Sequence, residues 1–232
     1  QMKLPYQHIF FDLDRTLWHF DENSRNVLHQ MYHQFELHPF IASPDDFIST
    51  YEIINEQLWK RYQQGRLSKE ILRSERFYQT LLQYHSDDAN KAAEMGDYYL
   101  THSPLQTGLL PYTKEILAYL SNKYQLHIIT NGFEEVQLIK LSNSGIIDYF
   151  QQLVFSEKVG VKKPHPLIFK RAIKNAQATF ENSIMIGDDF YADIHGAEKV
   201  GMDNIYFNPN KNKHQHQVKK EIFCLSELME LL

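Results

Sequence analysis

The feature that most constrains the fold is an alternation of short apolar runs with helical stretches after Pro111. The apolar runs are too short for buried helices and are bounded by turn-forming residues, so they predict strands. Strands that alternate with helices form a parallel sheet covered on both faces. We therefore expect an α/β fold with a Rossmann-like parallel sheet. The expected strands lie at residues 8–13, 126–130, 152–155, 183–187 and 204–207, and helices at 133–145, 166–177 and 190–200.

Residues 20–107 follow a helical pattern instead of this alternation. Val27, Leu28 and Met31 fall on one helical face, and similar spacing continues along the stretch. The segments 43–46 and 86–88 have the composition of helix N-caps. We expect three or four packed helices, inserted after the first strand. The expected organisation is an α/β core domain at residues 1–19 and 108–232 and an inserted α-helical domain at residues 20–107.

Composition narrows the possible partners. The 232 residues, 43% of them hydrophobic, are enough for a large core. The net charge is −5 and the chain has no dense basic block, which argues against a nucleic acid polymer as partner. No apolar run approaches the roughly 20 residues that span a bilayer, so we expect no membrane insertion. Cys224 is the only cysteine, which fits a reducing cytoplasm, and we expect a monomer or a weak homo-oligomer there.

Reactive side chains gather where the expected strands end, which is where open parallel sheets bind ligands. A carboxylate after a buried strand is costly unless a cation compensates it, so the pair Asp12 and Asp14 predicts a metal. Oxygen ligands of this kind favour Mg²⁺. The side chains lie at or just after the strand ends: Asp12, Asp14 and Thr16 for the first strand, Thr130 and Asn131 for the second, Lys163 before Pro164 for the third, and Asp188, Asp189 and Asp193 for the fourth.

Together these side chains predict a pocket for phosphoryl transfer. Thr130 offers a hydroxyl beside backbone N–H groups that suit an anion, Lys163 adds a cation, and Asp12 is free to attack. Each group alone has an ordinary alternative: an Asx-turn or helix cap for Asp12 and its neighbours, a turn at Thr130, a solvated loop at Lys163 and a helix N-terminus at Asp188. Their occurrence in order, each after a different strand, favours the functional interpretation.

The four groups resemble the four signature motifs of the haloacid dehalogenase superfamily, and they span most of the chain. The resemblance implies that Asp12 attacks the substrate phosphorus to give an aspartyl-phosphate. It implies that Asp14 protonates the leaving oxygen and then activates the hydrolytic water. It also implies a Mg²⁺ ion bound by the carboxylates of Asp12 and Asp188 and by the main-chain carbonyl of Asp14.

The same resemblance assigns supporting roles. Thr130, the backbone around Asn131 and the Lys163 ammonium are expected to bind the phosphoryl oxygens. The remaining motif residues are expected to support the metal ligands, with Asp189 left open as a direct ligand. These supporting residues are Thr16, Asp189 and Asp193.

The inserted helices resemble the helical cap of subfamily I, which shields the reaction from water and sets specificity. The runs 16–21, 130–133 and 145–150 resemble the branch of noncanonical pyrimidine 5'-nucleotidases, which act on nucleoside monophosphates. Trp18 and Phe20 are candidates to stack on a base, with packing inside the cap as the alternative. Arg66, in an expected break between helices, is a candidate to reach the substrate.

Several alternatives stay open from the sequence. A sugar-phosphate phosphatase or a phosphomutase keeps all four motifs. A haloacid dehalogenase lacks an acid at the position of Asp14, which argues against that activity. A response-regulator module has these residue types in another order, and the intact motif set disfavours a catalytically silent binding protein. Arg15 replaces the family's usual glycine, either as a cation at the pocket mouth or as an outward-pointing surface side chain.

Overall fold

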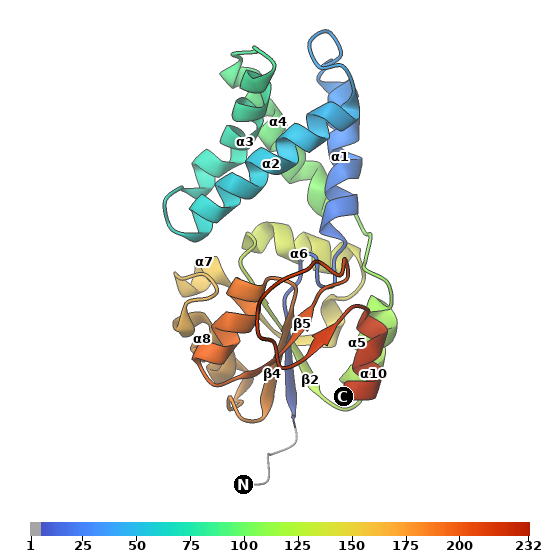
Figure 1. The fold of residues 1–232 in the computed structure, drawn as a ribbon, viewed down its shortest axis with the longest axis vertical. Coiled ribbons are helices and arrows are strands. Elements are labelled where there is room, and N and C mark those ends of the chain that lie inside the picture. The colour runs from blue at the N-terminus through green and yellow to red at the C-terminus, as the bar shows by residue number, and fades with distance from the viewer. Residues whose placement is uncertain (1–5) are drawn as a thin grey trace. The chain divides into compact units, whose positions relative to one another are not determined.

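The computed structural model describes residues 6–232. The chain forms two compact units, which we call the α/β unit (residues 6–20 and Thr107–Leu232) and the helical unit (Asp21–Gln106) (Figure 1). The helical unit is thus an insertion between the first and second strands of the sheet. None of the helices described for residues 6–232 has the length and apolar character needed to cross a lipid bilayer.

The α/β unit is built on a six-stranded parallel sheet with the order β3-β2-β1-β4-β5-β6. The sequence order reverses around the central β1, as in Rossmann-like folds. The fold class and the strands expected from the sequence are confirmed, and β6 is an additional short edge strand. The strands are β1 (His8–Phe11), β2 (Gln125–Thr130), β3 (Phe150–Phe155), β4 (Ser183–Gly187), β5 (Asp203–Phe207) and β6 (Glu221–Ile222).

Helices cover both faces of this sheet. On one face, Ile9 and Phe11 of β1 pack in a core shared with α5 (Thr113–Ser121) and α10 (Leu228–Leu231). On the other face, Phe10 packs in a core shared with α8 (Pro166–Ala176) and α9 (Gly196–Lys199). Figure 1 shows α8 on one side of the strands and α5 with α10 on the other. Because neighbouring strand residues point to opposite faces, a central strand covered on both sides is a continuous apolar run.

The strand register brings three strand ends to one edge of the sheet. Phe11, the last residue of β1, lies opposite Ile128 of β2 and Ile186 of β4. The backbone N–H of Asp12 then donates to the carbonyl of Ile186 at 2.9 Å. Asp12 is therefore held beside the end of β4. Asp188 is the first residue after that strand. Two shorter elements complete this region, α6 (Glu134–Asn143) after β2 and α7 (Ser156–Val159) after β3.

The helix expected at residues 190–200 is divided in two. The stretch begins with a π-helical turn, η3 (Phe190–His195), and continues as α9. Asp189 caps the turn, because its Oδ1 accepts hydrogen bonds from the backbone N–H groups of Tyr191 and Ala192, both at 2.9 Å. Wide turns of this kind are rare and occur often at functional sites. The turn carries Asp193, which is fully buried.

The helical unit consists of four main helices around its own apolar core. Phe47, Tyr51, Phe77 and Tyr99 lie in this core, which is separate from the two cores of the sheet. Ser43 and Asp88 are N-caps, as their segments predicted, because their side chains accept backbone N–H groups three residues later. The helices are α1 (Phe20–Gln34), α2 (Pro44–Gln63), α3 (Lys69–Gln83) and α4 (Ala89–His102), with a short 3₁₀ turn at Ser103–Leu105.

Candidate active site at the carboxyl edge of the sheet

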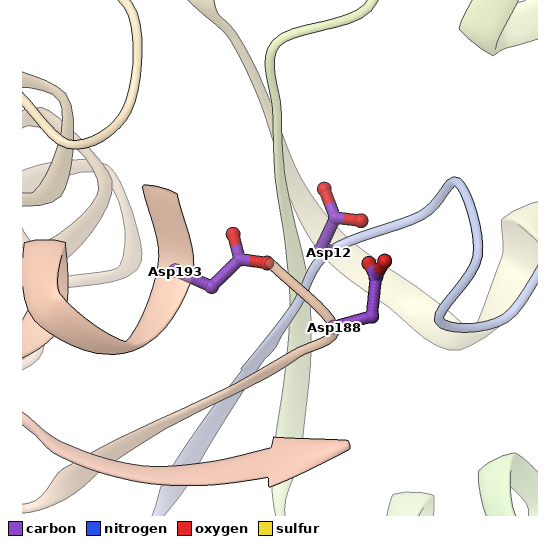
Figure 2. A group of neighbouring side chains, drawn as sticks. All are labelled: Asp12, Asp188 and Asp193. Carbon is purple, nitrogen blue, oxygen red and sulfur yellow. The ribbon is translucent and has the colours of Figure 1, made fainter. Parts of the chain in front are cut away.

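Three carboxylates converge where β1 and β4 end. Asp12 follows β1, Asp188 follows β4, and Asp193 projects from η3 toward them (Figure 2). One carboxylate oxygen from each side chain lies within 4.8 Å of one from each of the others. Gly187 permits this approach, since a Cβ there would lie 2.2 Å from Oδ2 of Asp193. The positions of the three carboxylates are therefore fixed by the strand ends and by the absence of a side chain at Gly187.

Lys163 is the cation buried in this acidic group. Its Nζ lies 2.7 Å from Oδ1 of Asp12 and 2.6 Å from Oδ1 of Asp193, and it also donates to the carbonyl of Ile129 at 2.8 Å. The side chain is only 2% exposed. Burial lowers the pKa of this ammonium, but the two carboxylates more than offset that effect, so the pKa is raised overall. Lys163 is therefore a fixed positive charge whose three donors are all used.

Burial and mutual repulsion raise the pKa values of the three carboxyl groups. Burial raises the pKa of Asp12, and Lys163 offsets part of this increase. Burial and the neighbouring Asp12 together hold the pKa of Asp188 well above its usual range. Burial likewise raises the pKa of Asp193 to about 7 despite its ion pair with Lys163. One ammonium thus compensates three nearby carboxylates only in part.

The donor set fits a hard divalent cation. Carboxylate oxygens at this spacing are typical ligands of Mg²⁺, and their excess negative charge favours a bound cation. Both oxygens of Asp193 are engaged, Oδ1 by Lys163 and Oδ2 by the backbone N–H of Asp189. Lys163 holds Oδ1 of Asp12 and not its Oδ2, so Asp12 and Asp188 are the carboxylates with capacity for the ion. Thr16 supports both of them, because its hydroxyl lies 3.1 Å from Oδ1 of Asp188 and 3.4 Å from Oδ2 of Asp12.

Asn131 fixes the loop that carries Lys163. The Asn131 side chain accepts the backbone N–H of Lys163 at 2.8 Å and donates to its carbonyl at 3.1 Å. Asn131 is 8% exposed, so this pair of hydrogen bonds is protected from water. The Asn131 side chain therefore anchors Lys163, and what it can offer an anion is its backbone.

Thr130 lies at the end of β2 with its hydroxyl already accepting two hydrogen bonds. Gly132 N–H donates to Oγ1 at 3.1 Å, and Gln137 Nε2 donates to it at 2.8 Å. A hydroxyl oxygen has two lone pairs and one hydrogen, so these contacts leave the hydrogen as the group available to a ligand. Thr130 is therefore oriented as a donor, which suits a phosphoryl oxygen.

Asp14 is held by two side chains that the sequence did not single out. Lys140 Nζ lies 2.6 Å from Oδ1 of Asp14, and Gln137 Nε2 lies 2.8 Å from Oδ2. Both donors come from α6, whose sequence has the pattern of an ordinary amphipathic helix. Gln137 was the one indication in the sequence that a polar side chain of this helix faces inward, because it lies one turn before Leu141 on the same helical face.

Asp189 differs from the other motif acids. It is exposed, and its Oδ1 caps η3 instead of facing the acidic group. Its backbone N–H donates to Oδ2 of Asp193 at 3.1 Å. Asp189 therefore shapes the turn that presents Asp193, while the acidic group itself contains Asp12, Asp188 and Asp193.

The aromatic candidates lie within the α/β unit but differ in exposure. Trp18 is fully buried, and the Lys140 Nζ lies 4.2 Å from its ring centroid, so this ring is packed and is not presented to a ligand. Phe20 is partly exposed, and the exposed Arg15 stacks on it with Cζ 4.3 Å from the ring centroid. Arg66 is exposed in the turn after α2, within the helical unit.

Comparison with known proteins places these residues in a family context. The family described as haloacid dehalogenase-like hydrolase matches residues 9–207. The pyrimidine 5'-nucleotidase PynA from Streptococcus pneumoniae is 29% identical over 232 residues, covering 98% of this chain and 95% of the relative. The pyrimidine 5'-nucleotidase YjjG from Escherichia coli is also 29% identical over 232 residues, covering 99% of each chain.

A solved structure agrees with the sequence comparison. The magnesium-bound crystal structure of the HAD-hydrolase YfnB from Bacillus subtilis matches this chain with a TM-score of 0.89 at 25% identity, covering 98% of this chain and 99% of that one. The match includes the sheet whose strand ends carry the acidic group and Lys163. With the family match extending over most of its length, this chain belongs to the haloacid dehalogenase-like hydrolases.

Proposed function

We propose that this protein is a magnesium-dependent phosphomonoester hydrolase that works through an aspartyl-phosphate on Asp12. The observation that carries the proposal is the environment of Asp12, a carboxylate 8% exposed that lies between the Lys163 ammonium and the Asp188 carboxylate. Lys163 holds Oδ1 of Asp12 at 2.7 Å, the Thr16 hydroxyl contacts Oδ2 at 3.4 Å, and the backbone N–H of Leu13 also bonds this carboxylate. These contacts fix the carboxylate in place, and we assign it as the nucleophile.

In the first half of the reaction, the Asp12 oxygen forms a bond to phosphorus while the ester P–O bond breaks. Asp14 gives its proton to the departing oxygen, so the leaving group departs as an alcohol. Lys163 and the Thr130 hydroxyl counter the charge of the phosphoryl oxygens, because both are held in place before substrate arrives. The products of this half are an alcohol and a phosphorylated Asp12.

In the second half, water attacks the phosphorus of the acyl phosphate. Asp14, now ionised, accepts a proton from that water, and the bond between phosphorus and the Asp12 oxygen breaks. Inorganic phosphate leaves and the Asp12 carboxylate is restored. The same carboxyl group thus acts first as acid and then as base, which requires that it stay in one place.

The acidic residues at the strand ends are suited to bind a magnesium ion. Asp12 and Asp188, with the main-chain carbonyl of Asp14, are the groups we assign to hold Mg²⁺. When bound, the ion would lower the repulsion between these carboxylates and an anionic substrate and would polarise a phosphoryl oxygen. Lys163 and Asp193 would keep the Asp12 carboxylate oriented with or without the ion, because their ion pair is independent of it.

For the substrate, we propose nucleoside 5'-monophosphates, with pyrimidine bases preferred. The support is the similarity to PynA and YjjG over nearly the whole chain, together with a partly exposed aromatic ring at Phe20. We further propose that the helical unit shields the reaction from water and selects the substrate. Arg66, an exposed cation in that unit, is its candidate contact to the substrate.

The test is phosphate release from a panel of pyrimidine and purine 5'-monophosphates, sugar phosphates and phosphoglycolate, with MgCl₂ and with EDTA. Asp12→Asn is the blank, and Asp148→Asn, an exposed acid of the same unit, is the matched control. The proposal expects magnesium-dependent release by wild type and by the Asp148 variant and none by the Asp12 variant. A folded wild-type protein that releases no phosphate from any of these substrates would refute it, and a preference for sugar phosphates would refute the nucleotide assignment.

A further inference from the structure

Both carboxylate oxygens of Asp14 have their own donor on α6. Lys140 Nζ contacts Oδ1 at 2.6 Å, and Gln137 Nε2 contacts Oδ2 at 2.8 Å. Gln137 and Lys140 are three positions apart and so lie on one face of the helix. Two donors on one rigid element fix both the position and the plane of a carboxylate, which a single contact does not.

The Lys140 side chain is buried and packed, unlike a flexible lysine on the surface. It is 3% exposed, and its ammonium lies 4.2 Å from the ring centroid of Trp18 and 5.5 Å from that of Phe20. A buried ammonium is costly unless a counter-charge and π faces compensate it. Asp14 supplies the counter-charge when it is ionised, as it is between the two halves of the reaction, and the two rings cover one side of the pair. This enclosure leaves the Lys140 ammonium little freedom to move away from Asp14.

Gln137 connects Asp14 to Thr130. Its Nε2 donates to Oδ2 of Asp14 and also, at 2.8 Å, to Oγ1 of Thr130. An ionised carboxylate only accepts, so in that state of Asp14 the amide faces it through its nitrogen. Gly132 makes room for this arrangement, since a Cβ there would lie 2.4 Å from the Gln137 side chain. One buried amide therefore orients two groups that have separate roles in the reaction.

We propose that Gln137 and Lys140 are positioning residues that hold the Asp14 carboxyl at the leaving oxygen and keep the Thr130 hydroxyl directed at the phosphoryl group. The inference rests on the proposed phosphatase function and adds to it two residues outside the four motifs. Both residues act through Asp14 and Thr130. Their removal leaves the nucleophile Asp12, its partner Lys163 and the metal acids in place.

This role makes a distinctive chemical prediction. An alkyl phosphate such as a nucleoside 5'-monophosphate must receive a proton as its P–O bond breaks, because the alkoxide is a poor leaving group. p-Nitrophenyl phosphate releases a weakly basic phenolate that departs without a proton. Loss of a positioned acid therefore slows the alkyl ester far more than the aryl ester. A general structural defect would slow both.

The test compares kcat/KM for uridine 5'-monophosphate and p-nitrophenyl phosphate in wild type, Lys140→Met and Gln137→Leu. Lys158→Met, which removes an exposed lysine of the same unit, is the matched control. The ratio kcat/KM is used because it covers the steps up to alcohol release and excludes hydrolysis of the phosphorylated enzyme. Thermal unfolding of each variant accompanies the kinetics, and the Gln137 variant keeps the test valid if the Lys140 variant is poorly folded.

The proposal expects a fall of roughly 100-fold for the alkyl ester and less than about 5-fold for the aryl ester in the Lys140 variant, in line with the usual contribution of a positioned acid. The Gln137 variant should show a fall shared by both esters, because Gln137 also orients Thr130, and a further fall on the alkyl ester alone. Lys158→Met should match wild type. Equal falls on both esters, or no fall on the alkyl ester, would overturn the proposal. Wild type without activity on either ester would instead refute the proposed function.

Discussion

The Lys163 ammonium lies 2.7 Å from a carboxylate oxygen of Asp12, although 151 positions separate the two residues in the chain. The contact exists because the parallel sheet brings the end of β1 close to the loop after β3, and Asn131 fixes that loop. Lys163 also pairs with Asp193. One buried cation therefore links three segments of the α/β unit and contributes to both stability and the site.

Replacing Lys163 should destabilise the fold severely. Lys163→Met leaves Asp12 and Asp193 buried without their counter-charge, which typically costs about 3–5 kcal/mol. Urea unfolding at neutral pH measures this loss. The matched control is Lys162→Met, a partly exposed neighbour, whose effect should stay within about 0.5 kcal/mol. Equal effects of the two substitutions would contradict the central place given to Lys163.

Magnesium should stabilise the folded protein through the acidic group. Because Asp12 and Asp188 repel each other when ionised, a bound divalent cation favours the folded state, by about 2.7 kcal/mol at a concentration 100 times its Kd. Thermal unfolding with MgCl₂, compared with NaCl at equal ionic strength, measures the effect. Asp188→Asn should lose most of it, and a full magnesium shift in that variant would contradict the assigned ligands.

His127 should contribute a loss of stability in acid, which Asp188 and Asp193 oppose because their raised pKa values act in the opposite sense. The His127 side chain is fully buried in β2 beside His8, and burial lowers its pKa to about 4. The unfolded chain takes up the proton near the ordinary value of about 6.5, so the contribution of His127 to stability is full above that pH and is lost as the pH falls toward 4. The loss should approach about 3 kcal/mol, at about 1.4 kcal/mol per pKa unit.

Urea unfolding from pH 7 to pH 4 checks the His127 prediction. His127→Leu removes the titrating group, so the unfolding free energy of the variant relative to wild type should rise by about that amount between pH 7 and pH 4. His38→Leu, which removes an exposed histidine, is the control and should keep the wild-type dependence. An unchanged slope in the His127 variant would show that other groups cause the acid sensitivity.

The strand ends made much of the site predictable from sequence. Asp12, Thr130 and Asp188 follow recognisable buried strands, so their meeting at one edge follows from the fold class alone. The edge strand β6 was missed because two residues carry no periodic signal. The π-helical turn was missed as well, since its width depends on contacts of Asp189 and Asp193 and not on apolar spacing.

The roles of side chains were harder to predict than their location. Asp193 was expected to support the metal ligands, and the structure brings its carboxylate into the acidic group and onto Lys163. Lys140 and Gln137 were missed because a basic and an amide residue on a helix usually face water. Only the tertiary packing of α6 against the loop after β1 turns them inward.

Arg15 offers a test of local backbone strain. Its φ is 64°, in the left-handed region, where a Cβ costs roughly 1–2 kcal/mol. Arg15→Ala and Arg15→Gly both remove the guanidinium that stacks on Phe20. The glycine variant should therefore be the more stable of the two by about 1 kcal/mol, the reverse of the usual order. Chemical denaturation of both variants decides this, and an alanine variant of equal or greater stability would refute the strain.

The measurement that tests the central claim most directly is the mass of the enzyme when it is acid-quenched during turnover of its best phosphomonoester with MgCl₂. The account predicts a fraction of wild-type chains heavier by one phosphoryl group, with the modification in the peptide that contains Asp12. Asp12→Asn should carry none, and Asp148→Asn should match wild type. A phosphoryl group on another residue, or turnover by Asp12→Asn at the wild-type rate, would contradict Asp12 as the nucleophile.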